Sequence, residues 1–154
     1  MKTKNDGKAI QQRPEQTGFT DGERRAIKER AKELKDEQRH NANAIEAEAD
    51  VLAKIAEMPD SDRIIAERLH ELVKRVAPML TFRTWYGMPA YVKDGNVVCF
   101  FQGSHKFKTR YATLGFSDKA KLDEGAMWPT AFALRQMDAQ DEKVIADLIK
   151  RAVS

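Results

Sequence analysis

The segment from Thr84 to Tyr91 is the part of the chain richest in side chains that could bind a ligand. It reads Thr-Trp-Tyr-Gly-Met-Pro-Ala-Tyr, so three aromatic rings surround a glycine and a proline. Because glycine permits unusual backbone angles and proline fixes one, we expect a stiff, partly apolar corner. The corner either closes the end of a sheet or forms one wall of a ligand pocket. The candidate ligand-binding residues here are Trp85, Tyr86, Met88, Pro89 and Tyr91, with Trp128 as part of a second wall.

A second candidate is the row of cations in the segment 106–116, whose composition is that of a strand. Side chains alternate across a strand, so Lys106, Lys108 and Arg110 are predicted to share one face. Three cations in a row could bind a carboxylate or a phosphate, and they could equally form the solvated face of a half-buried sheet. If this basic strand meets the aromatic corner, the two together suit a small ligand with an anionic end and an apolar body.

Other reactive residue types give weaker signals. Glu37 with His40, and Glu67 with His70, have the i, i+3 spacing that carboxylate metal sites on helices use, but glutamate is abundant on these helices and chance explains the spacing equally well. The metal ligands therefore stay unassigned. Cys99 lies in the most apolar segment and is predicted to be an inert core residue. Phosphate-binding loops, dinucleotide fingerprints and nucleophile elbows are absent from the sequence, so no catalytic residue and no cofactor are predicted.

The N-terminal helix is predicted from a capping box formed by Thr20 and Glu23, and it extends to about Arg39. Its apolar stripe consists only of Ile27, Ala31 and Leu34, which is too narrow to hold a helix firmly against a core. The helix is thus expected to be a solvated arm, or else to dock through that stripe on its own domain or on a partner chain. Docking on a partner would make the protein a homo-oligomer through the arm.

The rest of the chain predicts an α+β fold. Asn43 and Glu46 form a second capping box for a helix to about Glu57, and a core helix follows from Asp60 or Ser61 until Pro78. Further elements are expected as strands at 81–86, 90–93, 97–102, 106–116 and 132–137, a short helix at 117–123, and a final helix capped by Asp138. The turn Asp94-Gly95-Asn96 is a strong hairpin signal, so the sheet is expected to be antiparallel, with the N- and C-terminal helices packed on one face.

Length and composition limit the organisation and the partners. The 154 residues fit one domain with appendages: a disordered tail over 1–18, a charged helical arm over 19–41 and an α+β domain over 43–154. The 27 basic and 24 acidic residues leave a net charge of +3, a smaller excess than nucleic-acid binders usually carry, so the charge gives only faint support for a nucleic-acid partner and none is expected. A single cysteine, no apolar run near the roughly 20 residues that cross a bilayer, and no signal peptide predict a cytoplasmic protein without a membrane partner.

Several of these segments resemble the YdhG-like family, a bacterial domain family of unknown function that is sometimes compared with frataxin. The resemblance covers about residues 19–152, with an arm that looks like an N-terminal extension. It is carried by the segments 55–59 with Asp62-Arg63, 85–91, 97–101, 106–116 and 122–129. The resemblance implies a compact α+β fold with a curved antiparallel sheet.

The resemblance also implies an alternative activity, because some relatives are described as iron chaperones by analogy with the acidic ridge of frataxin. The core helix over 60–76 departs from that pattern, since it mixes acidic with basic residues. Three functions follow as hypotheses. The first is a non-catalytic binding or chaperone-like module for a small anionic ligand. The second is iron or other metal handling, and the third is a nucleic-acid or protein adaptor.

Overall fold

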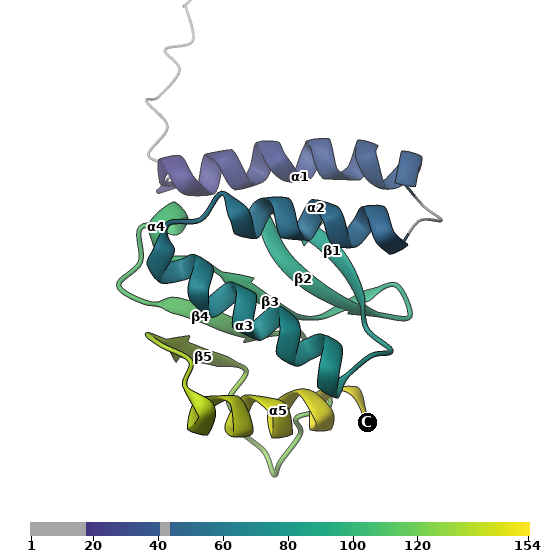
Figure 1. Cartoon of the computed structure of the whole chain (residues 1–154), viewed down its shortest axis with the longest axis vertical. Coiled ribbons are helices and arrows are strands. Elements are labelled where there is room, and N and C mark those ends of the chain that lie inside the picture. The colour runs from purple at the N-terminus through teal and green to yellow at the C-terminus, as the bar shows by residue number, and fades with distance from the viewer. Residues whose placement is uncertain (1–17, 41–43) are drawn as a thin grey trace, which may run out of the picture.

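The structure is a computed structural model of the chain, and it describes residues 18–40 and 44–154. Within these ranges helices and strands follow one another as α1 (Asp21–His40), α2 (Ala44–Ala56), α3 (Asp60–Val76), β1 (Thr81–Trp85), β2 (Met88–Lys93), β3 (Asn96–Gln102), α4 (Ser104–Phe107), β4 (Ala112–Phe116), β5 (Ala131–Leu134) and α5 (Ala139–Val153). Figure 1 shows α1 and α2 running side by side in opposite directions, α2 and α3 in front of the sheet, and α5 below α3.

The five strands form one sheet in the order β1-β2-β3-β4-β5, and every neighbouring pair is antiparallel. The predicted α+β class is thereby confirmed. The turn between β2 and β3 places Asp94 at φ 50° and Gly95 at φ 79°, the left-handed region that these two residue types tolerate best. The register between β2 and β3 shifts between Tyr91 and Val92, so the sheet contains a bulge at this point.

The hydrophobic core lies between the sheet and the helices that cover it. Cys99, Phe101 and Leu114 from the sheet are completely buried, and so are Leu69 of α3 and Ile149 of α5. The apolar positions of α3 recur at helical spacing, which is why one side of this helix is buried along its length. Burying one such side chain completely contributes roughly 1.5–3 kcal/mol.

A chain of polar contacts runs through this core and connects α2, α3 and β2. His70 is only 1% exposed; its Nδ1 atom lies 3.0 Å from the Tyr91 hydroxyl, and its Nε2 atom lies 3.0 Å from the Glu48 carboxylate. Glu48 also pairs with Lys74 at 2.8 Å, and hydrogen bonds from Lys74 and His70 lower the pKa of Glu48. Burial raises the pKa of Tyr91 well above its usual value. Both ring nitrogens of His70 therefore have partners, as a buried imidazole requires.

The helix ends confirm two predicted caps. The Glu23 amide donates to the Thr20 hydroxyl at 3.1 Å, and the amides of Asp138 and Asp141 each donate to the other's carboxylate at 2.9 Å. The predicted cap at Asn43 and residues 1–17 of the predicted tail lie outside the described residues. None of the helices in the described ranges has the length and apolar content needed to cross a membrane.

The segment predicted as one strand over 106–116 has a different structure. Residues Ser104–Phe107 form α4, Lys108 adopts the left-handed conformation with φ 53°, and β4 begins only at Ala112. The cause is a tertiary contact, since the buried Asp62 carboxylate accepts hydrogen bonds from the Ser104 hydroxyl at 2.7 Å and the His105 amide at 2.9 Å. This contact overrides the strand propensity of the segment.

Two shorter predicted elements also differ. The helix expected at 117–123 is a turn in which the Ala120 amide donates to the Ser117 carbonyl at 3.1 Å. The strand expected at 132–137 is β5, which begins one residue earlier and ends at Leu134. The remaining strands and the core helix match their predicted positions within two residues at each end.

The His70 contacts give a first prediction. Changing Tyr91 to Phe removes the hydroxyl and leaves the buried Nδ1 atom of His70 without a partner, so we expect the free energy of unfolding to fall by about 1–3 kcal/mol. Urea denaturation measures the loss. The matched control is Tyr111→Phe, because the Tyr111 side chain is 38% exposed and the same change there should cost less than about 0.5 kcal/mol. Equal losses in the two variants would show that the contact with His70 contributes nothing.

The buried cysteine gives a second prediction. Burial raises the pKa of the Cys99 thiol to about 12, and the thiolate is the reactive form, so the native protein should not react with an aromatic disulfide reagent at pH 8. In urea, the reaction rate should rise in parallel with the unfolded fraction measured by circular dichroism. Rapid labelling of the native protein would contradict the burial of Cys99.

Candidate ligand-binding site between α1 and α4

Helix α1 docks on the domain through a face that carries small and acidic residues. Gly22, Ala26, Glu29 and Glu33 recur at the spacing that places residues on one side of a helix. A Cβ atom at Gly22 would overlap the backbone carbonyl of Lys106, so only glycine permits this close approach. Ala26 and Glu33 are 3% and 7% exposed. The predicted helix therefore exists, but it is not a solvated arm.

The apolar stripe of α1, which was expected to do any docking, faces outward instead. Ile27 and Leu34 are 48% and 49% exposed, and Ala31 is exposed as well. Apolar spacing predicted the wrong face because the observed contact depends on a glycine, an alanine and paired carboxylates.

Glu33 joins α1 to the turn between β1 and β2. Its carboxylate accepts hydrogen bonds from the backbone amides of Gly87 at 2.8 Å and Tyr86 at 2.9 Å. Tyr86 and Gly87 both have positive φ, at 52° and 73°, which turns these amides toward the helix. Burial raises the pKa of Glu33, while the two amides and Arg30 act in the opposite direction. The corner predicted from the sequence is thus anchored on α1.

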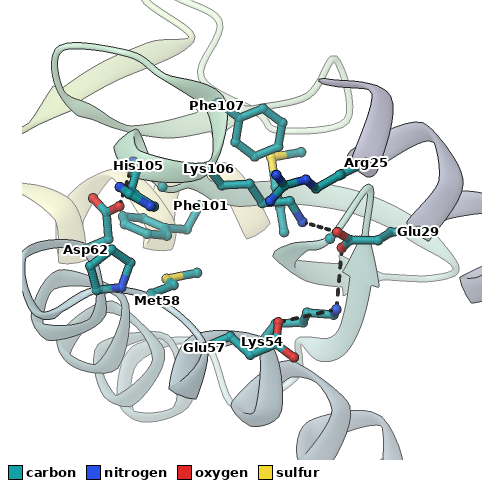
Figure 2. Close-up of a pocket in the computed structure, with 14 residues that line it drawn as sticks. Arg25, Glu29, Lys54, Glu57, Met58, Asp62, Phe101, His105, Lys106 and Phe107 are labelled. Carbon is teal, nitrogen blue, oxygen red and sulfur yellow. Dashed lines mark hydrogen bonds and ion pairs between the residues drawn. The ribbon is translucent and has the colours of Figure 1, made fainter. Parts of the chain in front are cut away.

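A cavity of about 300 Å³ lies between α1, the junction of α2 and α3, the β1–β2 turn and α4. Figure 2 shows the side chains of Arg25, Glu29 and Lys106 approaching one another on one side of the cavity, with Met58 and Phe101 facing them. Its apolar lining consists of Met58, Met88, Phe101 and Phe107. Its charged lining consists of Arg25, Glu29, Lys54, Glu57, Asp62 and Lys106, with His105 beside them.

Glu29 is at the centre of the charged lining. Its Oε1 atom accepts a hydrogen bond from Lys106 Nζ at 2.5 Å, and its Oε2 atom lies 3.4 Å from Lys54 Nζ. Oε2 is buried and receives no hydrogen bond, so Lys54 attracts it by charge alone. A Cβ atom at Gly87 would overlap the Glu29 carboxylate and the Lys106 ammonium, so the cluster also needs glycine at this turn.

A second hollow, of about 530 Å³, adjoins this cavity and shares Arg25, Pro59, His105 and Lys106 with it. Its further lining consists of Gly22, Ser61, Ser104, Lys108 and Thr109. All of these residues are among those that the structure describes, and none of them is a carboxylate. Among the described residues, three carboxylates outside the lining contact its members: Glu29 accepts a hydrogen bond from Lys106, Asp62 accepts one from Ser104, and the exposed Asp21 lies 3.6 Å from Lys108 Nζ. The described lining of this hollow is therefore cationic without an acidic member, which favours an anion.

Three of the nine predicted ligand-binding residues come together in this region. Met88 and Lys106 line the cavity, and Lys108 lines the adjoining hollow. Arg110 does not join them, since it is exposed and lies 5.4 Å above the Tyr111 ring. The predicted face of three aligned cations does not exist because α4 interrupts the strand.

The predicted aromatic walls have other roles. Trp85 packs edge-on against Phe100 at 5.3 Å, and Tyr86 lies beneath the Arg30 guanidinium at 5.9 Å. Tyr91 is completely buried against His70.

Pro89 is also buried, and it lies near the start of β2. Trp128 lines a separate hollow with Met127 and Phe116. Neither residue belongs to the lining of the cavity or of the adjoining hollow.

Sequence reasoning missed Arg25, Glu29, Met58 and His105. The first two lie in the arm, for which the sequence predicts docking only through the apolar stripe, and His105 lies between two predicted strands. The one usable signal was the pair Gly22 and Ala26, because small residues four positions apart indicate a close helix contact.

The predicted metal spacings do not form sites among the described side chains. Glu67 pairs with Arg63 at 3.6 Å, and His70 is occupied by Tyr91 and Glu48. The side chains of Glu37 and His40 lie outside the described residues. Within the described part of the chain, no three His, Cys, Asp or Glu side chains are close enough together to hold a metal ion.

No family model, curated protein or solved structure matches this chain. The resemblance to the YdhG-like family therefore stays a prediction. The α+β architecture, in contrast, is a property of the structure itself.

The contact of Glu33 with the β1–β2 turn gives a third prediction. Changing Glu33 to Ala removes the acceptor for two backbone amides, so the amides of Tyr86 and Gly87 should exchange with solvent deuterium at least tenfold faster. Amide exchange followed by NMR measures this directly. Lys32→Ala, an exposed change on the same helix, is the control and should leave both rates unchanged. Unchanged rates in Glu33→Ala would show that α1 does not anchor the turn.

Proposed function

We propose that the protein is a non-catalytic binding module for a small molecule with an anionic end and an apolar body. The observation that carries this proposal is the shared wall of Arg25, His105 and Lys106 between the cavity and the adjoining hollow. Because these three residues line both spaces, one ligand that extends from the cavity into the adjoining hollow can contact all of them. A cytoplasmic location is part of the proposal, and the single, free and buried cysteine supports it.

The anionic end fits the adjoining hollow. Arg25 carries a permanent positive charge there, and Lys106 and Lys108 add two ammonium groups. The Ser61 hydroxyl lines the same hollow and can donate to a phosphate or a carboxylate, whereas the Thr109 hydroxyl already donates to the Tyr111 carbonyl at 2.8 Å. Lys106 is held by the partly buried Glu29 at 2.5 Å, whereas Lys108 has, among the described residues, only the exposed Asp21 at 3.6 Å, so Arg25 and Lys108 are the cations most available to an added anion.

The apolar body fits the cavity, where Met58, Met88 and Phe107 supply flexible thioethers and an aromatic ring. The volume of about 300 Å³ is at the small end of the range for ligand pockets. The buried Glu29 Oε2 atom, which receives no hydrogen bond, is an acceptor that a hydroxyl or amino group of the ligand can satisfy.

Phenyl phosphate is a suitable probe, because it joins a dianion to one ring. Titration calorimetry at low salt should detect binding, and raising the ionic strength should weaken it. Lys108→Ala and Arg25→Ala should each lower the affinity by about fivefold to twentyfold, since each removes one charged contact. Met58→Ala should weaken the binding of phenyl phosphate but leave the binding of inorganic phosphate unchanged.

The control is Lys119→Ala, an exposed cation that lines neither the cavity nor the adjoining hollow, and it should bind as the wild type does. Circular dichroism of each variant checks that folding is intact. Absence of binding at millimolar phenyl phosphate, or an equal loss in Lys119→Ala, would refute the proposal.

A further inference from the structure

Between positions 24 and 35, the exposed side of α1 is strongly segregated in charge, although Asp21 before this stretch is exposed as well. Its exposed residues between positions 24 and 35 are Arg24, Arg25, Ile27, Lys28, Ala31, Lys32, Leu34 and Lys35. They comprise five cations and three apolar residues, and all are described. The acidic residues of this stretch, Glu29 and Glu33, face the domain instead. A helix surrounded by solvent would have no reason to separate its residues in this way, with the acidic residues on one side and both the cations and the apolar stripe on the other.

The exposed side of α2 has the opposite charge. From the start of α2 to the residue that follows it, the exposed residues are Ala44, Ile45, Glu46, Ala49, Asp50, Leu52, Ala53, Ala56 and Glu57. They comprise three carboxylates and six apolar residues, and every position of this stretch is described. Ile45 and Leu52 are 80% and 44% exposed. Two neighbouring helices of one molecule thus present complementary outer faces.

The basic, acidic and apolar residues form rows along α1 and α2, and these rows have a fixed order across the surface. The ion pair between Lys54 and Glu29 marks the side on which α2 and α1 face each other. Asp50 and Glu57 lie four and three positions from Lys54, so they share its side of α2. Arg25 and Lys32 have the same spacing from Glu29, so they share its side of α1.

The apolar stripes lie beyond these charges, with Ile27, Ala31 and Leu34 on the far side of α1 and Ile45, Ala49, Leu52 and Ala56 on the far side of α2. The order across the surface is therefore apolar, basic, acidic, apolar.

We propose that this α1–α2 face binds a second copy of the same chain through a two-fold axis that runs between the two helices. Because α1 and α2 lie side by side (Figure 1), an axis that is parallel to both and midway between them places α1 of one copy over α2 of the other. The cations then lie over the carboxylates of the partner, and each apolar stripe lies over the apolar stripe of the opposite helix. No other pairing of the surface with itself matches both charge and polarity, which is the reason for choosing a second copy as the occupant.

The α1–α2 face and the ligand site share only two residues, Arg25 and Glu57, which lie at the border between them. Variants that avoid these two residues can therefore separate the two proposals. Lys28 and Lys32 on α1, and Glu46 and Asp50 on α2, belong to the face and do not line the cavity or the adjoining hollow.

Sedimentation velocity at 10–100 µM, about the range that resolves micromolar dimers, tests the proposal on the full chain. The wild type should sediment as a dimer that dissociates at high salt. K28E/K32E and E46K/D50K should each sediment as monomers, because each brings like charges together across the two-fold axis. An equimolar mixture of the two should restore the dimer, since every reversed contact then meets an opposite charge.

The matched control for K28E/K32E is K119E/K143E, which makes the same change in net charge at exposed positions outside α1 and α2 and should remain dimeric. If a charge variant fails to fold, I27D/L34D on the exposed apolar stripe replaces it and should also be monomeric. A monomeric wild type would overturn the proposal, and binding of that monomer to phosphatidylserine vesicles would assign the face to a lipid surface. A dimer that survives all of these variants would overturn it as well.

Discussion

The buried carboxylate of Asp62 determines the geometry on which the candidate site depends. Asp62 is 2% exposed, and its two oxygen atoms accept hydrogen bonds from the Ser104 hydroxyl and the His105 amide. A buried carboxylate without such donors would be strongly destabilising, so the chain after β3 must supply them. Doing so bends residues 104–107 into α4. Lys106 then faces the cavity, and Lys108 enters the left-handed region beside the adjoining hollow.

The second condition for the site is that α1 comes close to α4 and the β1–β2 turn. Gly22 allows the contact with the Lys106 carbonyl, and Gly87 leaves room for the Glu29 carboxylate. Glu33 then satisfies two amides that the positive φ angles of the turn direct outward. Because each carboxylate on this face of α1 has a partner in the domain, the helix docks with little apolar burial. Both the cavity and the adjoining hollow have α1 as one wall, so the site exists only in the docked state.

Much of the fold could be predicted from the sequence because its signals are local. The spacing of Leu69 and its neighbours indicated the core helix, the Asp94-Gly95 turn indicated the hairpin, and Asp138 indicated the last helix. The candidate site could be predicted only in part, because its decisive contacts join distant residues. Asp62 lies 42 positions before Ser104, and Glu33 lies 54 positions before Gly87. Alternation placed Lys106, Lys108 and Arg110 on one face, and no local pattern could show that Asp62 would interrupt the strand.

Because the carboxylates of α1 that dock the helix face the domain, they also account for the charge of its outer surface. Once Glu29 and Glu33 are turned toward Lys106, Lys54 and the turn amides, the exposed residues between positions 24 and 35 are only cations and the short apolar stripe. On α2 the basic residue Lys54 is turned toward α1, and the exposed carboxylates remain. In the contact within the molecule, α1 therefore supplies negative charge and α2 supplies positive charge. Each of these is the charge that the outer face of the same helix lacks. The net charge of +3 conceals this arrangement, because the three exposed carboxylates offset three of the five exposed cations in the sum while the two faces stay separate in space.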